Sequence, residues 1–137
     1  MGCSDEQPAV EGAEVSEFFA GQVWTYTTRS GEDDSRLVVC KVEHNAKLGS
    51  IIHIHVEGVA IKSPSSPGGV SDVVGHMPFA EESLRESVVT AEETRTQLPD
   101  YEEGYRTWKS AFDAGKAGIF TTSVAEGVDF MEQALNR

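Results

Sequence analysis

The sequence predicts an α+β fold: an antiparallel β-meander over residues 22–62, followed by helices that pack on one face of the sheet. Three segments before residue 62 are rich in β-branched and aromatic residues and are separated by turn residues. Two segments near the carboxyl end carry apolar residues at helical spacing. A run of strands followed by a run of helices is typical of an α+β domain.

The three predicted strands of the meander cover residues 22–29, 36–44 and 50–62. If His44 pairs with Ser50, the apolar residues of the two strands lie opposite each other on one face of the sheet. A slip of one residue would expose all of them, which favours this register. The predicted core face then carries Trp24, Tyr26, Val38, Cys40, Val42, Ile52, Ile54 and Val56. In this register Cys40 faces Ile54 and is buried as a small apolar residue.

The segments around the meander are less regular. Residues 14–20 predict a short helix that ends at Gly21, and residues 70–77 predict a possible fourth strand after a Pro- and Gly-rich loop. Pro78 is predicted to begin a helix that carries Leu84 on its apolar side. Residues 89–98 fit either a strand or a loop, and residues 119–122 fit a short strand.

Two helices are predicted to close the chain. The first starts at Tyr101 with a cap from Asp100 and Glu103, and the second starts after Ser123, which forms a capping box with Glu126. The first helix carries an aromatic stripe of Tyr101, Tyr105, Trp108 and Phe112. At helical spacing this stripe is expected to pack on the meander, with Trp24 and Tyr26 as partners. The alternative is that Tyr105 and Trp108 line a ligand pocket.

The charge balance is strongly acidic, with 11 Lys and Arg against 23 Asp and Glu and a net charge of −12. Nucleic-acid binding is excluded, since such proteins neutralise phosphates with basic side chains. A basic protein partner is compatible with this charge. No apolar run approaches the length of roughly 20 residues that spans a bilayer, so no transmembrane segment is predicted.

The amino terminus is predicted to be a flexible acidic tail over residues 1–13, followed by a single domain over residues 14–137. Gly2-Cys3-Ser4 resembles the end of a bacterial lipobox, in which a small residue precedes a lipidated cysteine. That resemblance implies lipidation of Cys3 and a periplasmic or envelope location. The alternative is an ordinary start and a cytoplasmic protein.

His53 and His55 are the best chemical candidates in the chain. Residues i and i+2 of a strand point the same way, about 7 Å apart, and two imidazoles in this arrangement can bind one metal ion. Glu57 lies about 13 Å from His53 along the strand and does not complete such a site. We therefore expect no bound metal and no cofactor. The other interpretation is two histidines on the second face of the sheet, beside Lys41.

No catalytic motif is present, neither a G-x-S-x-G elbow nor a phosphate-binding loop. The leading prediction is a non-enzymatic binding module for a basic protein or a small ligand. The alternatives are a small metal-dependent or ligand-binding enzyme that uses the His53 and His55 face, and an envelope lipoprotein domain. Residues 21–26 (GQVWTY) and 120–126 (FTTSVAE) resemble small bacterial proteins of unknown function, which implies a bacterial source and no functional residues.

Overall fold

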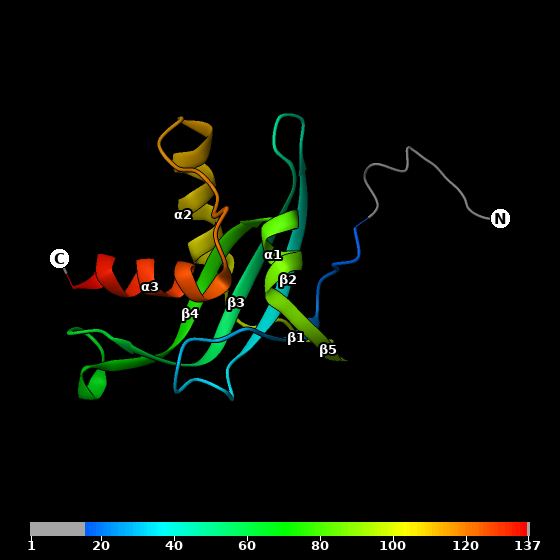
Figure 1. Ribbon diagram of the computed structural model, residues 1–137. Coiled ribbons are helices and arrows are strands. Elements are labelled where there is room, and N and C mark those ends of the chain that lie inside the picture. Colours follow the sequence, from blue (N-terminus) through cyan, green and yellow to red (C-terminus); the bar gives the residue numbers. More distant parts are fainter. Residues whose placement is uncertain (1–15, 137) are drawn as a thin grey trace.

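The computed structural model describes residues 16–136, and these form a five-stranded antiparallel sheet with three α-helices packed on it (Figure 1). The elements are β1 (Gln22–Tyr26), β2 (Arg36–Asn45), β3 (Gly49–Lys62), β4 (Val70–Ala80), α1 (Glu81–Ser87), β5 (Val88–Thr94), α2 (Glu102–Asp113) and α3 (Val124–Leu135). The predicted α+β class is confirmed, with its meander, its fourth strand and its two closing helices.

The strand order β4-β3-β2-β1-β5 places β4 and β5 at opposite edges of the sheet. Helix α1 carries the chain from one edge to the other across the core face, where Leu84 is fully buried. Residues 95–101 return across the opposite face. There Arg95 donates to Glu57 of β3, at 2.9 and 3.1 Å. The Asp100 carbonyl oxygen lies next to Gly75 of β4. The two crossings therefore cover different faces.

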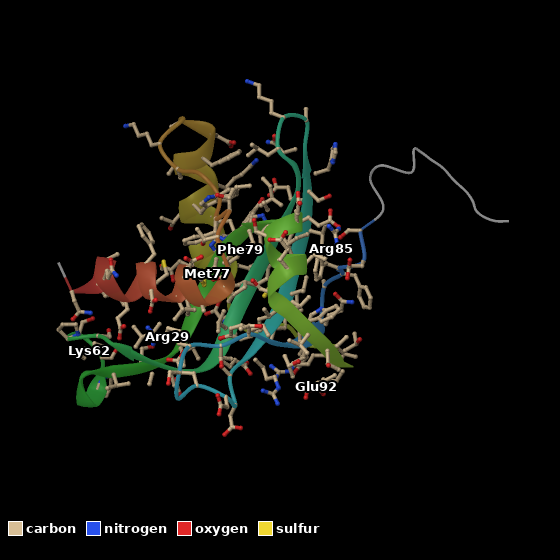
Figure 2. All side chains as sticks on the ribbon, viewed as in Figure 1. Arg29, Lys62, Met77, Phe79, Arg85 and Glu92 are labelled. Atoms are coloured by element: carbon tan, nitrogen blue, oxygen red, sulfur yellow. The ribbon has the colours of Figure 1, made fainter. Side chains whose placement is uncertain are left out.

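The apolar core lies between the sheet and the helices α1 and α3. Met77 and Phe79 of β4 are fully buried beneath α3, and Figure 2 labels both side chains where that helix crosses the strand. A Cβ atom on Gly127 of α3 would lie 2.9 Å from Met77 Cε and 3.0 Å from Phe79 Cζ. The glycine therefore allows the helix to pack closely on the strand.

Helix α2 lies against the other face of the sheet. The rings of Tyr105 and Trp108 contact the ring of His53, with centroids 4.9 and 5.0 Å apart. His53 itself is fully buried. The helices thus pack on both faces: α1 and α3 on the apolar core, and α2 on a face that carries histidines.

The predicted register of β2 and β3 is correct at the hairpin end and wrong beyond Cys40. His44 pairs with Ser50 and Val42 with Ile52, as predicted, but a register shift then makes Val39 the partner of Ile54. Cys40 is the extra residue of this bulge, which reverses the alternation of faces along β2. Leu37 and Val39 consequently join the core in place of Val38, which lies opposite His55.

One predicted helix is wrong, and one predicted helix start is wrong. Residues 16–20, the described part of the helix predicted over residues 14–20, are not helical, and Phe18 packs edge-on against Trp24. Pro78 lies inside β4 rather than at a helix start, and α1 begins at Glu81. An edge strand tolerates proline because one side of it lacks a full ladder of backbone hydrogen bonds.

The closing helices differ in their caps. Ser123 and Glu126 form the predicted capping box of α3, with Ser123 Oγ accepting from Glu126 N at 3.1 Å. The predicted cap of α2 is wrong: its N-cap is Tyr101, without a side-chain hydrogen bond. The short strand predicted over residues 119–122 is a single parallel bridge between Phe120 and Phe79. It brings the segment between α2 and α3 to the edge of β4.

Candidate functional site

A groove of about 710 Å³ lies between β4, the start of α2 and the segment that follows α2. We call it the β4–α2 groove. In Figure 1 the gold helix α2 rises beside β4, and the orange segment returns from it to α3. The lining includes His76, Tyr101, Trp108 and Phe120, together with the exposed acidic residues Asp100 and Glu103.

Gly104 sets how closely α2 approaches β4 at this groove. A Cβ atom at Gly104 would lie 2.9 Å from His76 Cβ, which is closer than side chains normally pack. The first turn of α2 therefore rests directly on His76. Any larger residue at this position would push the helix away from the strand and open the groove.

A chain of hydrogen bonds runs beneath the groove from Glu43 through His53 to His76. His53 Nε2 lies 2.9 Å from Glu43 Oε1, and His53 Nδ1 lies 2.8 Å from His76 Nε2. The two imidazole rings lie edge to edge and nearly parallel, with centroids 5.0 Å apart and planes at 19°. Glu43 is also held by the Tyr105 hydroxyl at 3.3 Å and by Lys109 Nζ at 3.2 Å.

The environment determines the charges along this chain. Burial raises the pKa of Glu43, but its bonds to His53 and Lys109 outweigh burial and leave that pKa below its usual value. Burial lowers the pKa of His53, against the opposing effect of Glu43. Burial, and then the neighbouring His53, lower the pKa of His76 to about 4. At neutral pH the chain is therefore one carboxylate and two neutral imidazoles.

These charges determine the direction of each hydrogen bond. A carboxylate only accepts, so His53 donates its Nε2–H to Glu43. A neutral imidazole has one donor and one acceptor, so His53 Nδ1 accepts from the Nε2–H of His76. Nδ1 of His76 is then left as a hydrogen-bond acceptor at the groove.

The structure brings three of the four predicted ligand-binding residues together, and the fourth lies apart. His53, Tyr105 and Trp108 form one cluster. His55 instead places Nδ1 3.3 Å from the Gly75 carbonyl oxygen and Nε2 3.6 Å from Glu57 Oε2. Since both nitrogens of His53 are bonded to other partners, the two histidines do not converge on a shared ion. Within residues 16–136 no group of three His, Cys, Asp or Glu side chains could hold a metal.

The aromatic stripe of α2 packs on different partners from those predicted. Tyr105 and Trp108 contact His53 and His76, whereas Trp24 and Tyr26 belong to the core face. The reason is that α2 lies on the opposite face of the sheet from Trp24, which pairs with the core residue Leu37. The stripe thus covers the polar face of the sheet.

Sequence reasoning missed His76, Glu43 and Gly104. Glu43 could have been found from the sequence. It lies two residues from Lys41 and therefore on the same face of the strand, and Lys41 was predicted to lie beside the histidines across the hairpin. His76 had no such signal, because its role depends on the register of β4 on β3. Cys3, the predicted lipidation site, lies outside the described residues.

Comparison with known proteins gives no relative for this chain: no family model, curated protein or solved structure matches it. In the described part of the chain, no helix combines the length and the apolar character needed to cross a membrane. The function of the groove must therefore be inferred from its own chemistry.

Proposed function

We propose that this protein is a non-enzymatic binding module whose β4–α2 groove takes a cationic group, such as a basic side chain of a protein partner. The observation that carries the proposal is the charge of the groove. Asp100 and Glu103 line it, and its described lining contains no Lys or Arg. Neither carboxylate has a side-chain partner among the described residues, so both are available to a ligand.

The aromatic walls of the groove suit the same kind of ligand. The faces of Trp and Tyr rings attract cations within about 6 Å of the ring centre, by roughly 0.5–2 kcal/mol. Trp108 is held in place by a hydrogen bond from Nε1 to the Gly118 carbonyl oxygen at 2.8 Å. The phenol of Tyr101 is neutral at physiological pH, and burial raises its pKa further. An ammonium or guanidinium group would therefore meet fixed aromatic rings beside two carboxylates.

The charge of the whole chain supports a basic partner. A net charge of −12 creates a negative potential that steers cations toward the surface, and salt screens this attraction over about 8–10 Å. Association with a basic protein is then expected to slow as ionic strength rises. The aromatic contacts in the groove would supply the part of the affinity that salt does not remove.

A titration tests the proposal. We expect acetyl-Gly-Lys-Gly-amide to shift the NMR signal of the Trp108 indole N–H saturably, and we expect acetyl-Gly-Glu-Gly-amide not to. The variant D100K/E103K should lose the shift. The matched control D33K/E86K changes the net charge equally at exposed residues outside the groove, and it should retain the shift. Equal behaviour of the two variants, or of the two peptides, would refute a cation site in the groove.

A second candidate is a ligand-binding enzyme that uses the same groove for acid–base chemistry. It is favoured by the chain from Glu43 through His53 to His76, because a carboxylate bonded to an imidazole is a common arrangement for a general base. The low pKa of His76 makes it a weak base at neutral pH, which ranks this candidate second. Turnover of an amine or ester substrate that H76F abolishes and H55F retains would favour the enzyme.

A further inference from the structure

Nδ1 of His76 is the one ring nitrogen of the His53–His76 pair that the hydrogen-bond chain leaves open. The other three nitrogens of the pair are bonded to each other or to Glu43. No donor within residues 16–136 is bonded to this atom. It lies on the side of Gly104, 3.9 Å from where a Cβ atom of that residue would stand. Both His76 and Gly104 line the groove.

Building on the proposed function, we infer that the β4–α2 groove selects cations that carry N–H donors, the side-chain ammonium of lysine or the guanidinium of arginine, over fully alkylated ammonium groups. The N–H group of the ligand donates a hydrogen bond to Nδ1 of His76. Glu43 and His53 act as positioning residues, because they hold His76 in the tautomer whose lone pair faces the ligand.

The packing around His53 keeps this tautomer in place. His53 is fully buried and is surrounded by the rings of His76, Tyr105 and Trp108. Solvent therefore does not compete for its two hydrogen bonds. Its own carboxylate partner, Glu43, is anchored by Lys109 and by the Tyr105 hydroxyl. The acceptor character of His76 is therefore built into the sheet and α2 before any ligand arrives.

A fully alkylated cation would gain only part of what the groove offers. It meets the aromatic rings as an ammonium does, and the charges of Asp100 and Glu103 attract it. It has no N–H, however, and its methyl groups would cover Nδ1 of His76 and leave that acceptor without a partner. A desolvated acceptor without a partner costs free energy, whereas a charge-assisted hydrogen bond is favourable. The difference between the two ligands includes the hydrogen bonds that the ammonium donates to the carboxylates as well as to His76, so the comparison with H76F isolates the share of His76.

The test compares Nα-acetyl-lysine methylamide with its Nε-trimethylated form by NMR titration at pH 7. We expect the unmodified ligand to bind about tenfold more tightly. H76F keeps an aromatic ring but removes the acceptor, and it should reduce the difference between the two affinities. An unchanged difference in H76F would assign the selectivity to the carboxylates and overturn the inference. Equal affinities in the unsubstituted protein would overturn the selectivity and leave the cation site standing. Absence of binding by both ligands would remove the cation site as well.

A second measurement needs no ligand, and its decisive result comes from the unsubstituted protein. The ¹⁵N shifts of the His76 ring should show a protonated Nε2 and an unprotonated Nδ1 at pH 7. E43Q retains an oxygen that can accept from His53 and should preserve this tautomer, whereas E43L should yield a mixture. The opposite tautomer of His76 in the unsubstituted protein, with the proton on Nδ1, would overturn the inference.

Discussion

Cys40 occupies the bulge of β2, and only 2% of its surface is exposed. Its thiol lies 3.6 Å from the Val38 carbonyl oxygen, with no cation to stabilise a thiolate among its described contacts. Burial, and then the negative charge of Glu57, raise the pKa of this thiol to about 12. The predicted burial of Cys40 is confirmed, although Ile54, its predicted neighbour, pairs with Val39.

We predict that Cys40 is inert in the native protein. In a C3S background it is the sole thiol, since the chain has two cysteines. Alkylation by iodoacetamide at pH 8 should be at least about a hundredfold slower in buffer than in denaturant, because only the thiolate reacts. The native rate should rise about tenfold per pH unit up to pH 10. Equal rates with and without denaturant would show that the bulge leaves Cys40 open.

The segment that leads into β1 depends on one glycine at a junction between strands. Gly21 has a φ of +99°, its N–H donates to the Val39 carbonyl at 2.8 Å, and its carbonyl accepts from Arg95 N at 2.8 Å. A Cβ atom there would clash with the Arg95 carbonyl oxygen. The residue thus links β2 to the end of β5 in a space that admits no side chain.

We predict that G21A destabilises the fold by about 3 kcal/mol, from backbone strain together with the clash against Arg95. The matched control is G49A, where φ is +80° but nothing lies within 4 Å of the added methyl. That control should cost only about 1 kcal/mol, which is the strain alone. Urea unfolding measures both values. If the two substitutions cost the same, then the contact with Arg95 contributes nothing.

At the scale of the whole molecule, the sheet separates two kinds of interior. One face carries the apolar core under α1 and α3, and the other carries buried histidines and ion pairs under α2 and residues 95–101. Figure 2 also shows Arg29 near β3, where it binds Glu32 at 2.6 Å and two acidic residues of α3. Stability should therefore depend on pH through groups on several elements.

Two pH windows follow from the shifted pKa values. His53 and His76 titrate lower in the folded protein than their usual 6.5, so the unfolded chain binds more protons and stability falls as pH drops from about 6.5 toward 4. The pKa of Glu57 is lowered, chiefly by its bond to Arg95. Its contribution is therefore present above about pH 4.5 and is lost as pH falls further.

We predict that the free energy of unfolding falls between pH 7 and pH 5, with His76 alone contributing about 2 kcal/mol of the loss. H76F removes that titration and should show a smaller difference between the two pH values, even if it is less stable at pH 7. Urea unfolding of both proteins at the two pH values measures this. An identical loss in both proteins would mean that His76 is protonated as easily when folded as when unfolded.

Strong local signals in the sequence were enough to predict several elements. Alternating β-branched residues predicted the meander, and helical spacing with a capping box at Ser123 predicted α3. Local patterns failed where the choice depended on distant contacts. The bulge at Cys40 forms only because β2 must match β3 at both ends, and Pro78 remains in a strand because β4 pairs with β3. Neither effect of strand pairing can be recognised from a stretch of a few residues.

Some residues of the site could be predicted from local patterns, and others could not. His53, Tyr105 and Trp108 were named as candidates because each belongs to a periodic element with a definite face. That they meet, and that Glu43 and His76 complete a hydrogen-bond chain with them, was decided by α2 packing on the second face of the sheet. The physical reason is that a hydrogen bond between side chains requires atoms about 3 Å apart. Only the tertiary packing of β2, β3, β4 and α2 brings them to that distance.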